Sequence, residues 1–174
     1  MTERAGVCVA DTNVGRGVFA TRDFAAGEVI LAFTGAPLSY EDTLTLSPQD
    51  EARTLQIDSG RYIDTEPPGR YTNHSCDPNS GVVEDKLVAL RPVLAREEIR
   101  FDYSTTMGLD DLWTMDCVCG APLCRGTIRA FATLPATLKE HYTRLGIVPA
   151  FLLREPERRE ETFRPAVKRS GAIG

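Results

Sequence analysis

Three cysteines within eight residues restrict this chain more than any other feature of its sequence. Cys117, Cys119 and Cys124 are separated by Gly120 and Pro122, which allow the tight turn needed to bring three thiols to one point. Such a group supplies three of the four ligands of a tetrahedral zinc site, so the spacing predicts a segment folded around a metal ion. The alternative is that the three are only small buried side chains, as free cysteines often are.

A closed zinc site needs a fourth ligand from elsewhere in the chain. Cys76 lies in a polar turn over residues 73–79, where a side chain can be presented without leaving a core strand. Cys8 lies in an apolar run and is better explained by packing, and His74 and His141 are the remaining candidates. The residues alone leave the choice open.

Composition places the chain among globular proteins that act inside the cell. With 174 residues, 42% of them hydrophobic and 26% charged, it fits one domain with a packed core. Five cysteines, an odd number clustered toward one end, do not resemble a secreted disulfide framework. No apolar stretch approaches the length of a membrane span and the start lacks a secretory signal, so we expect an intracellular protein, cytoplasmic or, in a eukaryote, nuclear.

The net charge of −5 argues against direct binding to nucleic acid and favours a basic partner. No contact with a membrane is expected.

Short β-branched runs separated by turns predict many short strands, paired antiparallel across the turns at residues 58–60 and 84–86. The predicted strands are 7–10, 17–21, 29–33, 55–57, 61–63, 80–83, 87–90 and 99–101. Residues 39–53 are expected to form a loop with a short helix. Helical spacing predicts two C-terminal helices, over residues 135–145, ending at Gly146, and over residues 150–158.

Four patterns in a fixed order point to a family. They are residues 15–19 (Gly-Arg-Gly-Val-Phe), 70–79 (Arg-Tyr-Thr-Asn-His-Ser-Cys-Asp-Pro-Asn), 98–103 (Glu-Ile-Arg-Phe-Asp-Tyr) and the cysteine cluster that ends in Cys124-Arg125-Gly126. Together they resemble the SET-domain protein-lysine methyltransferases that carry a post-SET zinc segment. The match of Asn-His-Ser-Cys, Phe-Asp-Tyr and the cysteine spacing in order is highly specific, whereas each pattern alone is weak.

The resemblance implies a mostly β fold of the β-clip type, with several small antiparallel sheets, a zinc-bound segment and C-terminal helices. It divides the chain into a SET domain (5–106), a post-SET zinc segment (107–130), a helical appendage (131–158) and a flexible tail (159–174). It implies methylation of lysine side chains of a basic protein substrate, with S-adenosylmethionine as cofactor and structural Zn²⁺.

The resemblance also assigns residues. Tyr103 matches the catalytic tyrosine, and Phe33 and Phe101 match positions of the substrate channel; phenylalanine at 101 leaves room for more than one methyl group. The implied cofactor-binding residues are Gly15, Arg16, Gly17, Val18, Arg70, Asn73 and His74. With Cys76 taken as the fourth ligand, the zinc ligands are Cys76, Cys117, Cys119 and Cys124.

Other interpretations remain to be weighed against this one. Gly15, Gly17 and Ala20 also satisfy the dinucleotide-binding fingerprint, but the glycines run into a strand-like stretch, and that fingerprint must open a helix. The polar turn at Asn73 is also explained by side-chain capping alone. The chain departs from the family pattern in its short segment over residues 62–70. The functional alternatives are a catalytically weak, SET-like zinc-binding interaction module and a methyltransferase that acts on a small amine.

Overall fold

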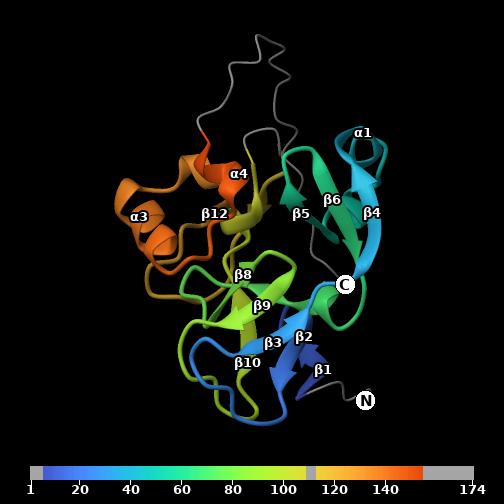
Figure 1. Ribbon diagram of the computed structural model, residues 1–174. Coiled ribbons are helices and arrows are strands. Elements are labelled where there is room, and N and C mark those ends of the chain that lie inside the picture. The colour runs from blue at the N-terminus through green and yellow to red at the C-terminus, as the bar shows by residue number, and fades with distance from the viewer. Residues whose placement is uncertain (1–5, 109–112, 155–174) are drawn as a thin grey trace.

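The computed structural model describes residues 6–108 and 113–154, and within them the strands form three small sheets and one isolated two-stranded pair (Figure 1). The first sheet, in the order β1–β2–β10–β7, consists of Val7–Thr12, Gly15–Ala20, Glu98–Phe101 and Asn73–His74. The second, β3–β9–β8, consists of Val29–Ala32, Lys86–Ala89 and Ser80–Val83. The third, β4–β6–β5, consists of Gly35–Ser39, Arg61–Thr65 and Thr54–Asp58, and the pair joins β11, Met115–Asp116, to β12, Thr127–Ile128.

Local sequence explains the two predicted hairpins. In the β8–β9 hairpin Val83 pairs with Lys86, and Glu84 in the connection adopts a left-handed φ of 57°. In the β5–β6 hairpin Gly60 supplies the left-handed residue, with φ of 65°, as turns of this kind require. All eight predicted strands overlap strands of the structure. The mostly β fold class is therefore confirmed.

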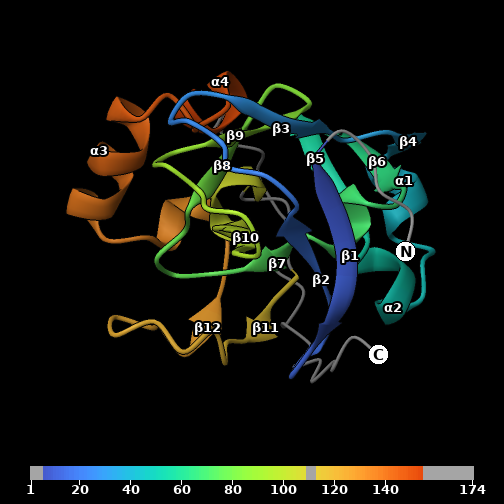
Figure 2. The same cartoon turned by 90° about the horizontal axis from the view of Figure 1, so that it is seen from below.

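One sheet contains a pairing that the sequence did not indicate. β7 has only two residues and runs parallel to β10, with Asn73 opposite Arg100 and His74 opposite Phe101. The other strand pairings of the described residues are antiparallel. Figure 2 shows β7 beside β10 and β2, in the middle of the molecule. The parallel pair brings the polar 73–79 turn next to the strand that leads to Tyr103.

The structure also differs from expectation over residues 35–53. β4 was not predicted, because Gly35 and Pro37 are poor strand formers; proline is tolerated there because β4 is an edge strand. The expected loop with one short helix contains two, α1 (Tyr40–Thr43) and α2 (Pro48–Glu51). Each begins at a serine whose side chain accepts from a backbone N–H three residues later.

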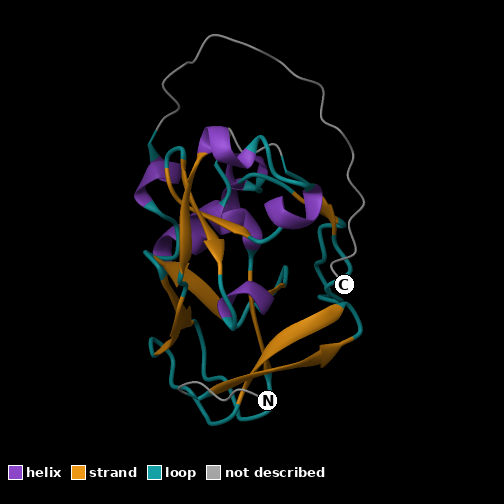
Figure 3. Ribbon diagram, turned by 90° about the vertical axis from the view of Figure 1, so that its right-hand side faces the viewer, coloured by secondary structure: helices purple, strands orange, loops and turns teal. Residues whose placement is uncertain are grey.

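The C-terminal part is helical, as predicted (Figure 3). α3 (Ala136–Arg144) stops before Gly146, which has a left-handed φ of 71°, and α4 (Ala150–Leu153) follows. The described residues also contain three 3₁₀ turns: η1 (Gly69–Tyr71), η2 (Tyr103–Thr106) and η3 (Phe131–Thr133). The expected continuation of the second helix to residue 158 and the expected tail lie outside the described residues. None of the described helices has the length and apolar character needed to cross a membrane.

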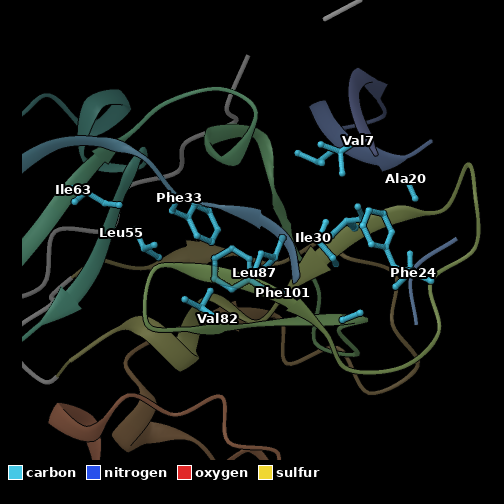
Figure 4. Close-up of a cluster of buried hydrophobic side chains, with 14 residues drawn as sticks. Val7, Ala20, Phe24, Ile30, Phe33, Leu55, Ile63, Val82, Leu87 and Phe101 are labelled. Carbon is cyan, nitrogen blue, oxygen red and sulfur yellow. The ribbon is translucent and has the colours of Figure 1, made fainter. Parts of the chain in front are cut away.

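The main hydrophobic core joins the three sheets. In Figure 4 the labelled side chains run from Leu55 and Ile63 of the third sheet, through Phe33 and Phe101, to Phe24 near the first sheet. A second cluster contains Phe131, Leu134, Tyr142 and Ile147, and it holds the C-terminal helices against β8.

The contact between Ile147 and β8 depends on a glycine. A Cβ atom at Gly81 would lie 2.6 Å from Cγ2 and 2.9 Å from Cβ of Ile147, closer than such atoms approach. The absent side chain at Gly81 therefore lets the segment after α3 pack directly on the sheet.

We predict that Gly81→Ala destabilises the fold by about 1–3 kcal/mol, the usual cost of forcing extra carbon into a packed core. Urea denaturation measures the change. Ile147→Ala alone should cost about 2–5 kcal/mol, and the double variant should be more stable than the sum of the two costs predicts, because the small residue at 147 makes room for the new methyl group. Strict additivity in this cycle would contradict the proposed contact.

Candidate active site

Asn73 connects two of the sequence patterns. Its Nδ2 donates to the carbonyl of Arg16 at 3.0 Å and to Oε1 of Glu98 at 2.8 Å. A Cβ atom on Gly17 would lie 2.6 Å from Glu98 Oε1 and 3.1 Å from Asn73 Nδ2, so only glycine allows this approach. The glycine-containing strand and the Asn-His turn therefore meet at one place, as the order of the patterns predicts.

The other predicted cofactor-binding residues lie around this contact in different ways. Gly15 begins β2 with a left-handed φ of 113°, and the guanidinium of Arg16 stacks 3.9 Å from the centre of the Tyr71 ring. Val18 is fully buried, with its side chain in the core and its backbone paired to the neighbouring strands β1 and β10. Arg70 is held by β6: its Nε donates to the carbonyl of Thr65, and its side chain forms an ion pair with Asp64. Since these glycines lie in a strand pair, β1–β2, the dinucleotide-binding interpretation is rejected.

Tyr103 faces a cavity of about 110 Å³ that is lined by residues of the third sheet, the short helices and η1. Its hydroxyl donates to the carbonyl of Thr72 at 2.9 Å. The predicted channel residues Phe33 and Phe101 line the same cavity, and the ring centroids of Phe101 and Tyr103 are 4.9 Å apart. Trp113 adds a further aromatic side chain, 6.3 Å from Tyr103 between centroids. The result is a narrow pocket with aromatic walls and a phenol held in place.

Burial and, secondly, the charge of Glu98 raise the pKa of Tyr103 well above its ordinary value of 10.0. Tyr103 is therefore a neutral phenol at pH 7. It can hydrogen-bond a ligand, but it is a poor general base.

His74 is 6% exposed and lies between Tyr103 and the cysteines. Its Nδ1 accepts the backbone N–H of Tyr103 at 3.3 Å, and its Nε2 lies 3.3 Å from Sγ of Cys76. Burial lowers the pKa of His74 to about 4, outweighing the attraction of Asp102, so the ring is neutral at pH 7. Because Nδ1 accepts a backbone N–H, the ring proton belongs on Nε2 and points to the sulfur of Cys76.

Of the predicted ligands, Cys76, Cys117 and Cys119 lie together with His74, whereas Cys124 lies outside this group. One ligand atom each from His74, Cys76, Cys117 and Cys119 lies within 4.8 Å of the others, and Sγ of Cys76 is 3.8 Å from Sγ of Cys117. Backbone N–H groups point to two of the sulfurs, from Cys76 to Cys119 at 3.4 Å and from Arg125 to Cys76 at 3.4 Å. Cys124 is exposed and lies beside the group, with its Sγ 3.6 Å from the carbonyl of Cys117. The other candidates lie elsewhere: Cys8 on β1 and His141 on α3.

The donor set fits zinc. Two thiolates at about 2.3 Å from one tetrahedral ion lie about 3.8 Å apart, which is the separation of Cys76 and Cys117. Burial raises the thiol pKa of Cys119, but hydrogen bonds from the backbone of Cys76 and Ala121 outweigh it and bring the pKa down to about 7.

A buried ion pair that sequence reasoning missed supports both groups. Asp102 is 1% exposed and receives two hydrogen bonds of 2.7 Å from the guanidinium of Arg125, which follows the last cysteine. The hydroxyl of Tyr142 on α3 donates to it at 2.8 Å, and the backbone N–H of Ser104 at 3.1 Å. Asp102 directly follows the predicted strand over residues 99–101, and a carboxylate at the end of a buried strand needs a cation nearby.

Fold and site together define a class of protein: a β domain of small sheets in which an Asn-His strand, a phenol at an aromatic cavity and a thiol cluster meet. Comparison with known proteins agrees. The SET-domain family model matches residues 15–104, just over half of the chain. This protein belongs to the SET-domain family, as the sequence patterns indicated.

The relatives are much longer proteins. Histone-lysine N-methyltransferase, H3 lysine-4 specific, from Eremothecium gossypii is 28% identical over 63% of this chain and 13% of its own length. The variant-silencing SET domain-containing protein of Plasmodium falciparum is 31% identical over 63% of this chain and 5% of its own. The chain thus spans a small part of these relatives.

Solved structures agree in fold. The structure of ctPRC2 in an autoinhibited conformation bound to S-adenosylmethionine matches with a TM-score of 0.52 and 21% identity, over 58% of this chain and 15% of that chain. A humanized mutant of Chaetomium thermophilum Polycomb Repressive Complex 2 bound to the inhibitor GSK343 also gives a TM-score of 0.52, at 22% identity, over 57% and 15%.

We predict that Arg125→Ala destabilises the protein by about 3–5 kcal/mol, because it leaves the carboxylate of Asp102 buried without its cation. The matched control is Arg91→Ala, which removes a 2.7 Å pair with Glu97 at a half-exposed position and should cost less than about 1 kcal/mol. Thermal or urea unfolding compares the two. Equal losses would show that the buried pair has no special weight.

Proposed function

We propose that this protein transfers methyl groups from S-adenosylmethionine to the side-chain amine of lysine in a basic protein. The observation that carries the proposal is the aromatic cavity with the Tyr103 hydroxyl fixed at its wall. The butyl stem of a lysine is apolar and suits the rings of Phe33 and Phe101, while its amine needs the few polar atoms that the cavity offers. The net charge of −5 suits a positively charged polypeptide.

The residues present fit the cofactor where β2 meets β7. The Asn73 amide, the Arg16 carbonyl and the Glu98 carboxylate gather donors and acceptors at one point, and the amino-acid end of the cofactor carries an ammonium and a carboxylate that such groups bind. We assign Gly15, Arg16, Gly17, Val18, Asn73 and His74 to this site. Arg70 contacts β6 and the cavity, so we expect it to act from the substrate side.

When bound there, S-adenosylmethionine would supply an electrophilic methyl group on sulfonium for transfer to the amine nitrogen, with a neutral thioether as the leaving group. The remaining work belongs to the chain. A free lysine has a pKa near 10.4, and burial between aromatic rings lowers that pKa, which favours loss of one proton to solvent before transfer. Tyr103 then orients the amine. The cavity walls exclude water, so catalysis rests on the alignment of the amine with the methyl group.

The relatives indicate which substrate to test first. Five of them are named for lysine 4 of histone H3, so we propose histone tails as the first class of substrate, with other basic proteins as the alternative.

We further propose a structural zinc ion held by Cys76, Cys117, Cys119 and Cys124. His74 is the competitor for the fourth position, but its ring argues against that role. Nδ1 already accepts the backbone N–H of Tyr103, so a metal on Nε2 would leave the imidazole with no proton at all. A zinc-bound histidine normally keeps its second ring proton to donate outward. Cys124, exposed and beside the group, can complete the site by a small side-chain rotation.

We predict that Tyr103→Phe lowers methyl transfer by about 10- to 100-fold, the effect of one hydrogen bond to a reacting group, with cofactor binding near normal. Labelled cofactor and a histone H3 peptide measure transfer, and calorimetry measures binding. Tyr142→Phe removes a buried phenol hydroxyl outside the cavity and serves as the control for a loosened fold. If Tyr103→Phe turns over like the unaltered protein, the phenol has no place in the mechanism.

We predict about one zinc per chain, lost in Cys124→Ser and retained in His74→Gln and in the control Cys8→Ser. Elemental analysis of the purified proteins counts the metal, and thermal melting should show lower stability where it is lost, because metal binding contributes folding free energy. Zinc retained in Cys124→Ser and lost in His74→Gln would assign the fourth position to the histidine.

A further inference from the structure

One hydroxyl of the cavity has no partner. Thr72 is 3% exposed, and its Oγ1 has no hydrogen bond to any residue in the described ranges 6–108 and 113–154. The backbone of Thr72 is fully engaged, because its N–H donates to the carbonyl of Gly69 and its carbonyl accepts from Tyr103. A buried hydroxyl without a partner is unfavourable, so such a group in a folded protein calls for an explanation.

The other threonines of the cavity show that this is unusual. Five threonines line it, and four of them donate to backbone carbonyls. The four donor and acceptor pairs are Thr43 with Tyr40, Thr54 with Glu51, Thr65 with Arg53 and Thr106 with Tyr103. Gln56, the cavity's amide, is likewise occupied by Gly108 and Asp58. Among the described residues, the hydroxyl of Thr72 is therefore the threonine group left for a ligand in the cavity.

Its place relative to the reacting group follows from the same contacts. The carbonyl of Thr72 accepts a hydrogen bond from the hydroxyl of Tyr103, so Thr72 lies directly beside the phenol. Phe33 and Phe101 line the same cavity and have no polar side-chain atom. For an amine bound there, the available partners at Thr72 and Tyr103 are Oγ1 of Thr72 and the phenol oxygen, which can still accept a hydrogen bond.

We propose that Thr72 is an amine-binding residue that limits how many methyl groups are added. This inference rests on the proposed lysine methylation. A neutral lysine amine has two N–H groups, one for each oxygen, with its lone pair free for the methyl group. A monomethylated amine has one N–H, so a second round must place a methyl group against one of the oxygens. The hydroxyl of Thr72 thus favours the first transfer over later ones. Its effect is opposite to that of Phe101, whose side chain leaves room for more than one methyl group.

The test compares Thr72→Val, which keeps the shape, with Thr72→Ser, which keeps the hydroxyl. The full chain, S-adenosylmethionine and unmethylated or monomethylated peptide are incubated, and mass spectrometry measures the methylation states. We expect Thr72→Val to change the ratio of kcat/KM for the two peptides by about tenfold in favour of the monomethylated one, the effect of one hydrogen bond, and to accumulate dimethyl product. Thr72→Ser should behave like the unaltered protein.

Thr65→Val is the matched control, because it removes a buried cavity hydroxyl that is already bonded to Arg53. It should melt at a lower temperature with an unchanged ratio of products, whereas Thr72→Val should melt at the same temperature as the unaltered protein or above it. A wild-type product ratio in Thr72→Val, or a loss of melting temperature equal to that of Thr65→Val, would overturn the inference. If the unaltered protein methylates no lysine, the proposed function fails as well; if it does and the ratio is insensitive to Thr72, only this inference fails.

Discussion

The buried carboxylate of Asp102 is the constraint on which the arrangement of this molecule depends. A carboxylate that is 1% exposed requires full pairing, and its partners come from three parts of the chain: Arg125 after the cysteines, Tyr142 on α3 and the backbone of Ser104. Asp102 is preceded by Phe101 and followed by Tyr103. The pairing that satisfies the charge therefore also fixes the two cavity walls and holds the cysteine segment and the C-terminal helices against the sheets.

His74 connects the segment after Asp102 to the cysteine cluster. Its ring lies between the backbone of Tyr103 and the sulfur of Cys76, and its pKa, lowered by burial to about 4, keeps it neutral over the physiological range. A neutral ring with one acceptor and one donor matches these two neighbours, and a charged ring would not. One buried side chain thus bridges the backbone of Tyr103 and the sulfur of Cys76.

Local signals in the sequence predicted most of the strands, and they failed where the structure depends on distant pairing. β-branched runs and glycine turns marked eight strands, whereas β4 contains Gly35 and Pro37, and β7 is only Asn73 and His74. Neither has strand propensity; each forms because a neighbouring strand offers hydrogen bonds. The pair of Asp102 and Arg125 spans 23 residues and leaves no local pattern. The family patterns named both residues within their motifs without indicating that they meet.

The polar atoms of the cavity divide into those that hold the fold and those that remain for a ligand. Hydroxyls such as those of Thr65 and Thr106 donate hydrogen bonds to backbone carbonyls, so they stabilise the cavity walls and are not free to donate to a substrate. The hydroxyl of Thr72 has no partner among the described residues, and the oxygen of Tyr103, whose hydrogen goes to the carbonyl of Thr72, can still accept a hydrogen bond. Phe33 and Phe101 add apolar surface to the same cavity. Under the proposed function the stem of a lysine covers these rings and its amine pairs with the two oxygens, whereas an apolar chain without nitrogen would leave the hydroxyl of Thr72 unpaired.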